Sequence, residues 1–418
     1  MEHVLGLDCL VCGERYASAG VEYVCPRHGD DGILDVAYDY PAIAAAVDRD
    51  RLGGPGMWRY RALLPVATGS RTPPIQVGGT PMHEAPRLAD PLGVGRVWVK
   101  DEGRQPTASL KDRASAMAVV KADEAGAAVI TTSSTGNAAA ALSGICASVG
   151  RPNVIFVPAA APPAKVTQLL AYGSTVILVD GAYDDAVALC MHAASTRGWY
   201  NRTTGFNPYM SEGKKTVSFE IAEDLGWEAP DAVFVSVGDG CIIGGVHKGF
   251  RDLLAMGWID RMPRLYGVQA EGSNYLAQAW AGGEDVLTKP PIEPSTVADS
   301  ISAGLPRDRI KALRAVEESE GAFVTVPDGD ILAAIPAMAR GSGVFGEPAG
   351  AAAYAGLVRA ADLGLVGRGD RVVVINTGSG LKDVASARRA AEAAGTGTVT
   401  VAPSTAALDE VLDRLSLP

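Results

Sequence analysis

Lys111 stands in a setting where a lysine could attack a carbonyl group. A turn from Pro106 to Ser109 breaks the chain just before it, and the following run of Ala, Met and Val predicts a helix near residues 110–125. In the first turn of a helix, free N–H groups and the macrodipole present positive charge, so a protonated amine is disfavoured. We therefore expect Lys111 to lose its proton easily, as Schiff-base chemistry requires. The alternative is a surface lysine beside a capping Ser109.

A polar turn offers a second set of chemical groups in AVITTSSTGNAAAALSGICASVG, residues 128–150. This segment predicts a strand, a turn and an Ala-rich helix, and the turn carries Ser134, Thr135 and Asn137. Hydroxyls and free backbone N–H groups at a helix N-terminus suit a carboxylate. The alternative is an ordinary capped loop between a strand and a helix.

A glycine-rich turn lies in AVFVSVGDGCIIGGVHKGF, residues 232–250. An apolar strand runs into Gly238-Asp239-Gly240-Cys241-Ile242 and then into a helix. Glycines let the backbone approach an anion closely, and the helix start supplies N–H donors, so the segment predicts a phosphate cradle. It has neither a Walker loop nor the spacing of a dinucleotide fingerprint. Because the carboxylate of Asp239 would repel a phosphate, we expect it to point away and leave only its N–H for the ligand.

A fourth segment, DRVVVINTGSGLKD at residues 370–383, ends an apolar strand in Asn376 and Thr377. Hydroxyls at the C-terminal edge of a parallel strand stand where ligands bind in open α/β sheets. The alternative is a plain turn after a strand.

In this order, the four segments resemble the fold-type II enzymes that use pyridoxal phosphate, and within them the threonine synthase branch. The resemblance covers nearly the whole chain and includes GGTPMHEAPRL (78–88) and EPAGAAAYAGL (347–357). The motifs ASLKDR and SSTGN at this separation are specific, whereas the glycine turn is a looser match.

The resemblance implies roles for the cofactor residues. Lys111 would form the Schiff base, Asn137 would hydrogen-bond the ring hydroxyl, and Thr377 would face the pyridine nitrogen. Backbone N–H groups from Gly238 to Ile242 would hold the phosphate. A neutral hydroxyl cannot keep the ring protonated as an Asp would, so the ring should be a weaker electron sink. That favours elimination or replacement at the β or γ carbon over transamination.

The resemblance also implies substrate contacts, at Ser134, Thr135, Asn207, Met210 and Lys215. Ser134 and Thr135 would hold the substrate carboxylate. The sharpest departure lies in FNPYMSEGKKTVSFEI (206–221), where Met210 replaces the family arginine that grips the phosphate of O-phosphohomoserine. Arginine binds phosphate through a charged, bidentate fork that a thioether lacks. Either the substrate differs, or Met210 merely packs and another basic residue, such as Lys214 or Lys215, serves instead.

The first forty residues predict a separate module. Two Cys-rich pairs, each followed by a glycine, have the spacing of a zinc ribbon, with twelve residues between Cys9-x2-Cys12 and Cys25-x2-His28. A structural zinc is one interpretation, and a worn ribbon without metal is the other. We expect no disulfide, because nothing marks the chain as secreted.

The composition is that of a cytoplasmic α/β enzyme. The chain has 418 residues, 47% hydrophobic and only 6% aromatic, and a formal net charge of −11. This charge argues against nucleic acid or an anionic membrane as the main partner. We expect neither a signal peptide nor a membrane span, since the longest apolar stretch, residues 125–150, is interrupted by Thr-Ser-Ser-Thr-Gly-Asn. The resemblance implies a homodimer.

Alternating strands and helices predict parallel sheets covered on both faces. Strands are predicted near residues 96–100, 128–132, 153–157, 175–179, 232–237, 264–269, 322–326 and 371–375, and helices near 110–125, 163–173, 183–197, 216–225 and 328–340. From the resemblance, we expect two three-layer domains with the active site between them. The predicted boundaries are a zinc-ribbon-like module at 1–40, a large domain at 41–109 and 206–395, a small domain at 110–205, and an appended strand and helix at 396–418.

These features predict a threonine synthase-like lyase, which would eliminate phosphate from O-phosphohomoserine and hydrate the product to threonine. The alternative is β-replacement or β-elimination on serine, phosphoserine or a related amino acid through an aminoacrylate, as in cysteate synthase. Met210 supports that alternative. A non-catalytic amino-acid-binding protein is a remote third hypothesis, because the chain keeps both the lysine and the phosphate cradle.

Overall fold

The computed structural model describes residues 1, 3–21, 23–161 and 163–415, and its strands form three sheets. The largest sheet has six strands in the order β12-β11-β10-β13-β5-β4, and its neighbours run parallel except for β4 and β5. Its members are β4 (Met82–Glu84), β5 (Arg96–Asp101), β10 (Ala232–Ser236), β11 (Arg264–Ala270), β12 (Ala322–Val326) and β13 (Arg371–Asn376).

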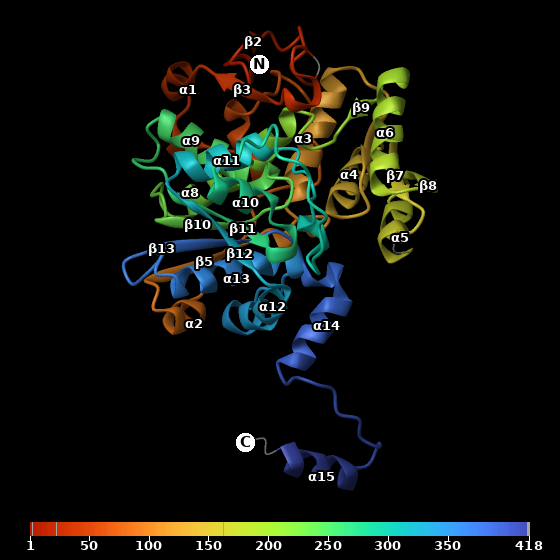
Figure 1. The fold of residues 1–418 in the computed structure, drawn as a ribbon, viewed down its shortest axis with the longest axis vertical. Helices are drawn as coiled ribbons and strands as arrows, with labels where there is room; N and C mark the ends of the chain where they lie inside the picture. Colours follow the sequence, from red (N-terminus) through yellow and green to blue (C-terminus); the bar gives the residue numbers. More distant parts are fainter. Residues whose placement is uncertain (2, 22, 162, 416–418) are drawn as a thin grey trace.

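Helices cover both faces of this sheet because its apolar strands are buried on both sides. Along β10, Val233 and Val235 belong to one apolar core, whereas Ala232 and Phe234 belong to another. In Figure 1, one face carries α8 (Thr216–Asp224), α9 (Cys241–Ala255), α10 (Tyr275–Gly282) and α11 (Arg309–Glu318), and the other carries α2 (Pro86–Ala89), α12 (Asp328–Ser342) and α13 (Pro348–Asp362). The large unit is therefore the predicted three-layer arrangement.

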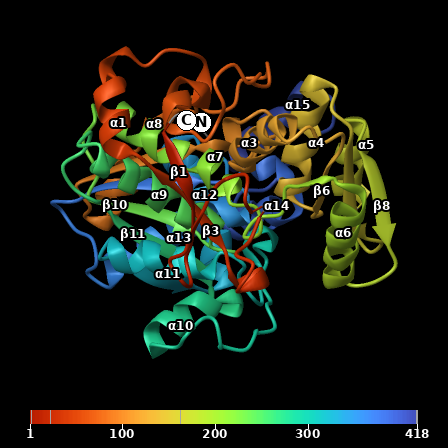
Figure 2. The ribbon, with the colours of Figure 1, turned by 90° about the horizontal axis from the view of Figure 1, so that it is seen from above.

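The second sheet has four parallel strands in the order β8-β7-β6-β9. They are β6 (Ile130–Ser133), β7 (Asn153–Pro158), β8 (Thr175–Val179) and β9 (Tyr200–Asn201). The helices of this region are α3 (Lys111–Glu124), α4 (Asn137–Val149), α5 (Pro163–Ala171) and α6 (Tyr183–Arg197). Figure 2 shows α5, α6 and β8 at one side of the molecule, away from β10 and β11.

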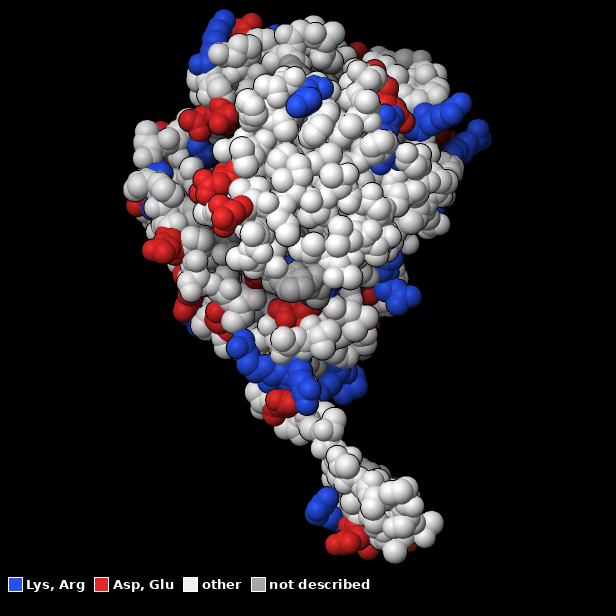
Figure 3. Space-filling model, turned by 90° about the vertical axis from the view of Figure 1, so that its right-hand side faces the viewer, with Lys and Arg blue, Asp and Glu red and all other residues white. Residues whose placement is uncertain are grey.

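The face formed by α5, β8 and α6 carries few charged side chains (Figure 3). Leu170, Leu178 and Leu189 are exposed there. No helix within the described part of the chain is long and apolar enough to cross a membrane.

The N-terminal module is an antiparallel sheet in the order β2-β1-β3, with β1 (Val4–Cys9), β2 (Arg15–Tyr16) and β3 (Leu34–Tyr38). It is followed by α1 (Tyr40–Ala46) and a 3-10 segment at Gly56–Leu63. The module packs on the large unit: Leu7 and Val36 share an apolar core with Phe250 of α9, and Asp35 accepts a 2.6 Å hydrogen bond from Arg251.

The predicted strands and helices are confirmed, each with bounds within two residues of those observed. The predicted C-terminal strand is wrong: across residues 396–415 the structure has one helix, α15 (Thr405–Leu415), and no strand. This segment lacks a partner strand that could pair its backbone. Figure 1 shows α15 held away from the body, beyond α14 (Val384–Ala393).

Candidate active site

Lys111 is the first residue of α3, as predicted, and the turn before it is fixed to the loop after β13. The N–H of Leu110 donates to the Thr377 carbonyl at 3.0 Å, and the N–H of Ser379 donates to the Ala108 carbonyl at 3.0 Å. The alternative of a lysine beside a capping Ser109 is wrong, because the helix starts from Leu110 without a side-chain cap. These pairings hold the lysine beside Thr377.

The two residues after Lys111, Asp112 and Arg113, stabilise the same turn and the start of α3. Asp112 is fully buried, and its carboxylate accepts hydrogen bonds from the N–H of Thr107, at 2.7 Å, and from its hydroxyl. Arg113 is also fully buried and donates to Glu102 and Glu220, each at 2.7 Å. In the ASLKDR motif, Asp112 and Arg113 thus orient α3. Lys111 is left as the reactive group of the motif.

The pKa of Lys111 is lowered from its ordinary value, as predicted. Burial is the main cause, and the positive charge of Arg202 adds to it. Asp239, Glu347 and Asp308 act in the opposite direction on this pKa. From the sequence, the helix start alone predicted the lowered pKa. The structure adds two causes, which are desolvation and the charge of Arg202, an arginine distant only in sequence.

The glycine turn forms a close-fitting cradle before α9. Gly240 has φ of 87°, and a Cβ there would lie 2.8 Å from Ala312 Cβ and 2.9 Å from the Asp308 carbonyl oxygen. A Cβ at Gly238 would lie 2.7 Å from Ile301 Cα. The helix starts at Cys241, so the N–H groups of its first turn, including that of Ile242, lack partners within the helix.

Asp239 makes two contacts that are compatible with the phosphate prediction. Its side chain is exposed, and Oδ1 accepts from the N–H of Arg307 at 3.4 Å. The backbone carbonyl of Asp239 accepts from the N–H of Asp308 at 2.9 Å. Both interactions join Asp239 to the segment at Arg307 and Asp308, and its orientation relative to a bound phosphate stays a prediction. The next side chain, Cys241, contacts the amine of Lys214 through its Sγ.

Asn137 begins α4 and reaches across to the large unit. Its Nδ2 donates to Glu347 Oε1 at 2.6 Å and lies 3.4 Å from Ser300 Oγ. Glu347 is buried, and burial raises its pKa. The backbone N–H of Glu347 donates to the Gly378 carbonyl at 3.1 Å, so Glu347 also lies beside Thr377. No role was predicted for Glu347 from the sequence. Its position just before Pro348, at the start of α13, was the signal that could have identified it.

Ser134 and Thr135 occupy the loop between β6 and α4 and are half-buried. Ser134 Oγ accepts from the N–H of Gly136 at 3.2 Å, which shapes the loop locally. Their role as ligands of a substrate carboxylate stays a prediction.

Asn207 and Met210 lie where the chain enters α7 (Tyr209–Lys214). The Asn207 amide donates to the Asn201 carbonyl at 2.8 Å and accepts from the N–H of Tyr209 at 3.0 Å, so it stabilises the loop. Met210 is 1% exposed and belongs to the main apolar core. This geometry favours packing for both residues, and their predicted substrate contacts stay predictions.

Lys215 is committed to buried acids. Its Nζ lies 2.6 Å from Glu212 and 2.7 Å from Asp252, and it lies over the ring of Tyr38. Lys214 differs: it is fully buried, and its charge is not matched by a carboxylate in any ion pair among the described residues. Of the two lysines considered for the missing arginine, Lys214 is therefore the one without a carboxylate partner among the described residues.

The predicted metal ligands come together in the N-terminal module. The ligand atoms of Cys9, Cys12, Cys25 and His28 all lie within 4.8 Å of one another. Burial raises the pKa of Cys25, but hydrogen bonds from Tyr16 and His28 outweigh it and lower the value to about 6. The glycines after the two pairs adopt φ of 73° and 54°, the left-handed conformation expected of tight turns.

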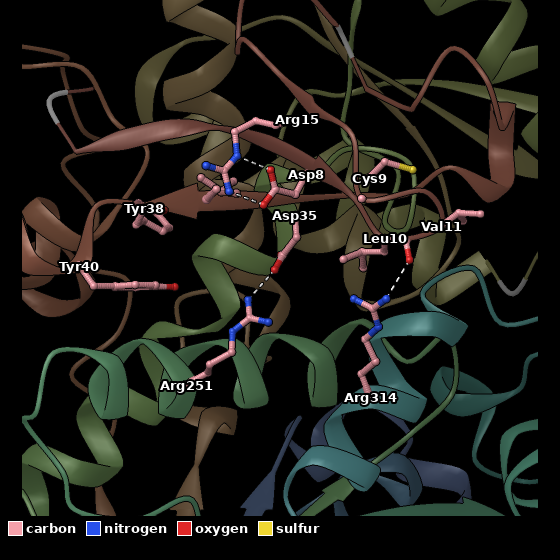
Figure 4. A pocket seen from close by; sticks show the side chains of 13 residues that line it. Asp8, Cys9, Leu10, Val11, Arg15, Asp35, Tyr38, Tyr40, Arg251 and Arg314 are labelled. Atoms are coloured by element: carbon pink, nitrogen blue, oxygen red, sulfur yellow. Dashed lines mark hydrogen bonds and ion pairs between the residues drawn. The ribbon is translucent and has the colours of Figure 1, made fainter.

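A surface cavity beside this module is distinct from the Lys111 site (Figure 4). Its lining includes Asp35 and Arg251, which pair at 2.6 Å, and Arg314, which donates to the Leu10 carbonyl at 2.8 Å. None of the predicted cofactor residues lines it. The chemistry predicted from the sequence therefore lies elsewhere, around Lys111.

A family model described as "Pyridoxal-phosphate dependent enzyme" matches residues 74–378, which include Lys111, the glycine turn and Thr377. The chain belongs to this family. The match confirms the fold class predicted from the sequence and a pyridoxal phosphate cofactor.

Several curated members of the family that resemble the chain are named threonine synthase. The protein of Methanosarcina acetivorans is 41% identical over 90% of this chain and 92% of its own length. That of Methanocaldococcus jannaschii is 36% identical over 92% and 94%, and that of Mycobacterium leprae is 38% identical over 78% and 87%.

Solved structures of more distant members show the same fold. Isoform 2 of threonine deaminase from Solanum lycopersicum has a TM-score of 0.66 and 21% identity over 85% of this chain and 93% of its own. Maize serine racemase has a TM-score of 0.62 and 22% identity over 76% and 92%.

The residues around Lys111 fit the family's cofactor. A lysine with a lowered pKa can condense with the cofactor aldehyde. The turn at Gly238 and Gly240 has no room for side chains and presents unpaired N–H groups at the start of a 15-residue helix, which suits a phosphate. Asn137 donates a hydrogen bond to Glu347, and the N–H of Glu347 donates to the carbonyl of Gly378, the residue after Thr377. Their individual contacts to the cofactor remain predictions.

Proposed function

We propose that the protein converts O-phosphohomoserine and water to threonine and phosphate. The observation that carries the proposal is the half-buried Lys111, which is held beside Thr377 and whose pKa is lowered by desolvation and by the charge of Arg202. Support also comes from relatives named threonine synthase that match at 36–41% identity over 90% or more of the chain.

Bound pyridoxal phosphate withdraws electrons from the substrate Cα and so acidifies its proton. Lys111 is the base at this carbon: burial and Arg202 lower the pKa of its Nζ, which favours the neutral form that accepts the Cα proton. Once deprotonated again, the same amine removes a proton from Cβ while the Cγ–O bond breaks and phosphate leaves. Water adds its hydroxyl at Cβ. Of the three protons released from Cα, Cβ and water, one returns to Cα, one goes to Cγ and one to the departing phosphate, which balances the conversion.

The neighbouring groups position the reactants. We assign the cofactor phosphate to the N–H groups from Gly238 to Ile242, the ring hydroxyl to Asn137, and the pyridine nitrogen to Thr377. A hydroxyl at that nitrogen leaves the ring uncharged, which limits electron storage and favours prompt loss of the leaving group. Ser134 and Thr135, beside the start of α4, hold the substrate carboxylate.

A spectral titration tests this function. O-phosphohomoserine, O-phosphoserine and serine are added separately to the holoenzyme while cofactor absorbance and released phosphate are followed. The expected result is phosphate and threonine from O-phosphohomoserine at a kcat/KM at least tenfold above that for any other amino acid. Phosphate release from O-phosphoserine alone would refute the proposal.

Met210 supports a second candidate. The buried thioether stands where the resemblance places a phosphate-binding arginine, so a β-substituted amino acid such as serine or phosphoserine could be the substrate. Lys111 would again take the Cα proton, but the leaving group would depart from Cβ. Formation of pyruvate and ammonia, or of a β-substituted product, would distinguish this reaction from threonine formation.

We also propose a structural zinc held by Cys9, Cys12, Cys25 and His28. The clustering of their ligand atoms within 4.8 Å supports it, as does a low thiol pKa at Cys25. Because Cys25 is buried and the set provides four ligands, the ion would have no open position for a substrate.

The resemblance supports a cytoplasmic homodimer, and we propose that assembly. We further propose that residues 110–205 act as a small domain against 41–109 and 206–395, because the strands β6 to β9 form their own sheet. The module at 1–40 and the appendage at 396–418 complete the division. Sedimentation velocity on the holoenzyme tests the dimer.

A further inference from the structure

Arg202 is a buried cation whose charge is not paired. Its side chain is 1% exposed, and its Nη2 has no hydrogen-bond partner. Its Nε donates to Ser115 Oγ at 3.2 Å, which orients the guanidinium without neutralising it. None of the ion pairs found in the described residues includes Arg202. Burying an unpaired guanidinium costs free energy, so we expect an anion to bind to Arg202.

Lys214 is the second unpaired cation, and it approaches the same place from another element. Its side chain is fully buried at the end of α7 and contacts Cys241, the first residue of α9. Thr204 Oγ1 lies 3.4 Å from Arg202 Nη1 and 3.5 Å from Lys214 Nζ. The guanidinium and the amine therefore converge on one hydroxyl.

This pair lies next to the reactive lysine. Ser115, which holds Arg202, is four residues after Lys111 on α3 and so lies on the same helix face, about one turn or ~5 Å along the axis. Burial, then the charges of Lys111 and Arg202, lower the pKa of Lys214. Three basic groups thus face one another, and a bound anion would offset the positive charge that disfavours protonation of the two lysines.

Other buried cations in the molecule are matched by acids. Arg113 pairs with Glu102 and Glu220, and Lys215 pairs with Glu212 and Asp252. The fold therefore neutralises buried charge where the role is structural. Arg202 and Lys214 depart from this pattern, and they do so at the site.

We propose that Arg202 and Lys214 together bind the phosphate group of the substrate and so replace the arginine missing at position 210. Arg202 provides the planar, bidentate fork, and Lys214 adds a point charge. The inference rests on the proposed function and specifies how a phosphorylated amino acid is recognised.

The cofactor phosphate has a separate set of donors. The unpaired N–H groups at the start of α9 lie in the large unit, whereas Arg202 follows β9, which pairs with β6 of the small sheet. The strand β6 leads into the loop of Ser134 and Thr135, where we place the substrate carboxylate. A substrate anchored there by its carboxylate would extend its phosphate between the two sheets, toward the two cations.

Steady-state kinetics on Arg202→Met and Lys214→Met test the proposal. Each change should raise KM for O-phosphohomoserine and the inhibition constant of inorganic phosphate by roughly tenfold or more, about 1.4 kcal/mol. Arg202→Lys should recover part of the loss, because it keeps the charge but not the fork. Arg197→Met is the matched control, since that arginine is exposed at the end of α6. The dissociation constant of pyridoxal phosphate, read by absorbance, should stay within about twofold.

The outcomes separate this inference from the proposed function. Unchanged phosphate inhibition in both Met variants would overturn it, and so would a loss confined to cofactor affinity, which would assign the cations to the cofactor. If the native enzyme forms no threonine but Arg202→Met still weakens inorganic phosphate or O-phosphoserine binding at constant cofactor affinity, the phosphate site stands and the proposed function fails.

Discussion

Replacing Gly240 by alanine tests whether the glycine turn is as closely packed as the structure shows. The residue has φ of 87°, in the left-handed region, and the added Cβ would lie 2.8 Å from Ala312 Cβ and 2.9 Å from the Asp308 carbonyl oxygen. Both contacts are with parts of the molecule that cannot swing aside. The change therefore introduces backbone strain and a collision at the same atom.

Gly257 provides a matched control at the other end of the same helix. It has φ of 69°, but nothing lies within 4 Å of the Cβ position. Gly257→Ala should therefore destabilise by the conformational cost alone, roughly 1–2 kcal/mol. Gly240→Ala should add an overpacking cost of roughly 1–3 kcal/mol. The expected difference between the two variants is thus about 2 kcal/mol, which exceeds the scatter of roughly 0.5 kcal/mol for independent sites.

Urea unfolding of both variants without cofactor measures this difference, and titration with pyridoxal phosphate measures its functional effect. We expect Gly240→Ala to weaken cofactor binding, since the backbone must shift to relieve the collision, while Gly257→Ala binds as the native protein does. Equal free energies of unfolding for the two variants would refute the packing argument. Native cofactor affinity in a destabilised Gly240→Ala would refute the assignment of this turn to the phosphate.

Three further predictions concern Lys111, Asp112 and Cys25. Lys111→Ala should lower kcat by ~10³-fold or more, and borohydride should no longer fix the cofactor to the chain, which mass spectrometry checks. Because burial raises the pKa of Asp112 to about 6, its protonated form stabilises the folded state at low pH, and that contribution is lost as pH rises through 6. The free energy of unfolding of the native protein minus that of Asp112→Asn should therefore fall by about 2 kcal/mol from pH 4 to pH 7; a constant difference would contradict the burial argument. Metal analysis should find one zinc per chain, lost in Cys25→Ser; a metal-free native protein purified without chelators would favour the worn ribbon.

The regular elements were predictable because their signals are local. Apolar runs such as Val372 to Ile375 identify buried parallel strands, and the turn before Lys111 identifies a helix start. The C-terminal strand was wrong because β-propensity at residues 398–401 carries no information about a partner strand.

The groups that set the charge of the site were not predictable in the same way. Arg202 lies 91 positions after Lys111 and reaches it only because the two-residue strand β9 pairs with β6. A strand of that length leaves no periodic pattern. Glu347 belongs to a motif that had been noted, but its contact with Asn137 joins residues 210 positions apart. The sequence contained each of these residues without indicating that they meet.

The distribution of buried charge determines how readily Lys111 accepts a proton. Paired ions such as Arg113 with Glu102 fix α3, whereas burial and the positive field of the unpaired Arg202 lower the pKa of Lys111. The lowered pKa favours the neutral amine, which can condense with an aldehyde but is also a weaker base. A phosphate dianion bound to Arg202 and Lys214 would offset the field and raise the basicity of Lys111 just when the Cα proton must be taken. A substrate without the phosphate would leave the field in place, so the same cations that recognise the leaving group would also favour reaction of the phosphorylated substrate.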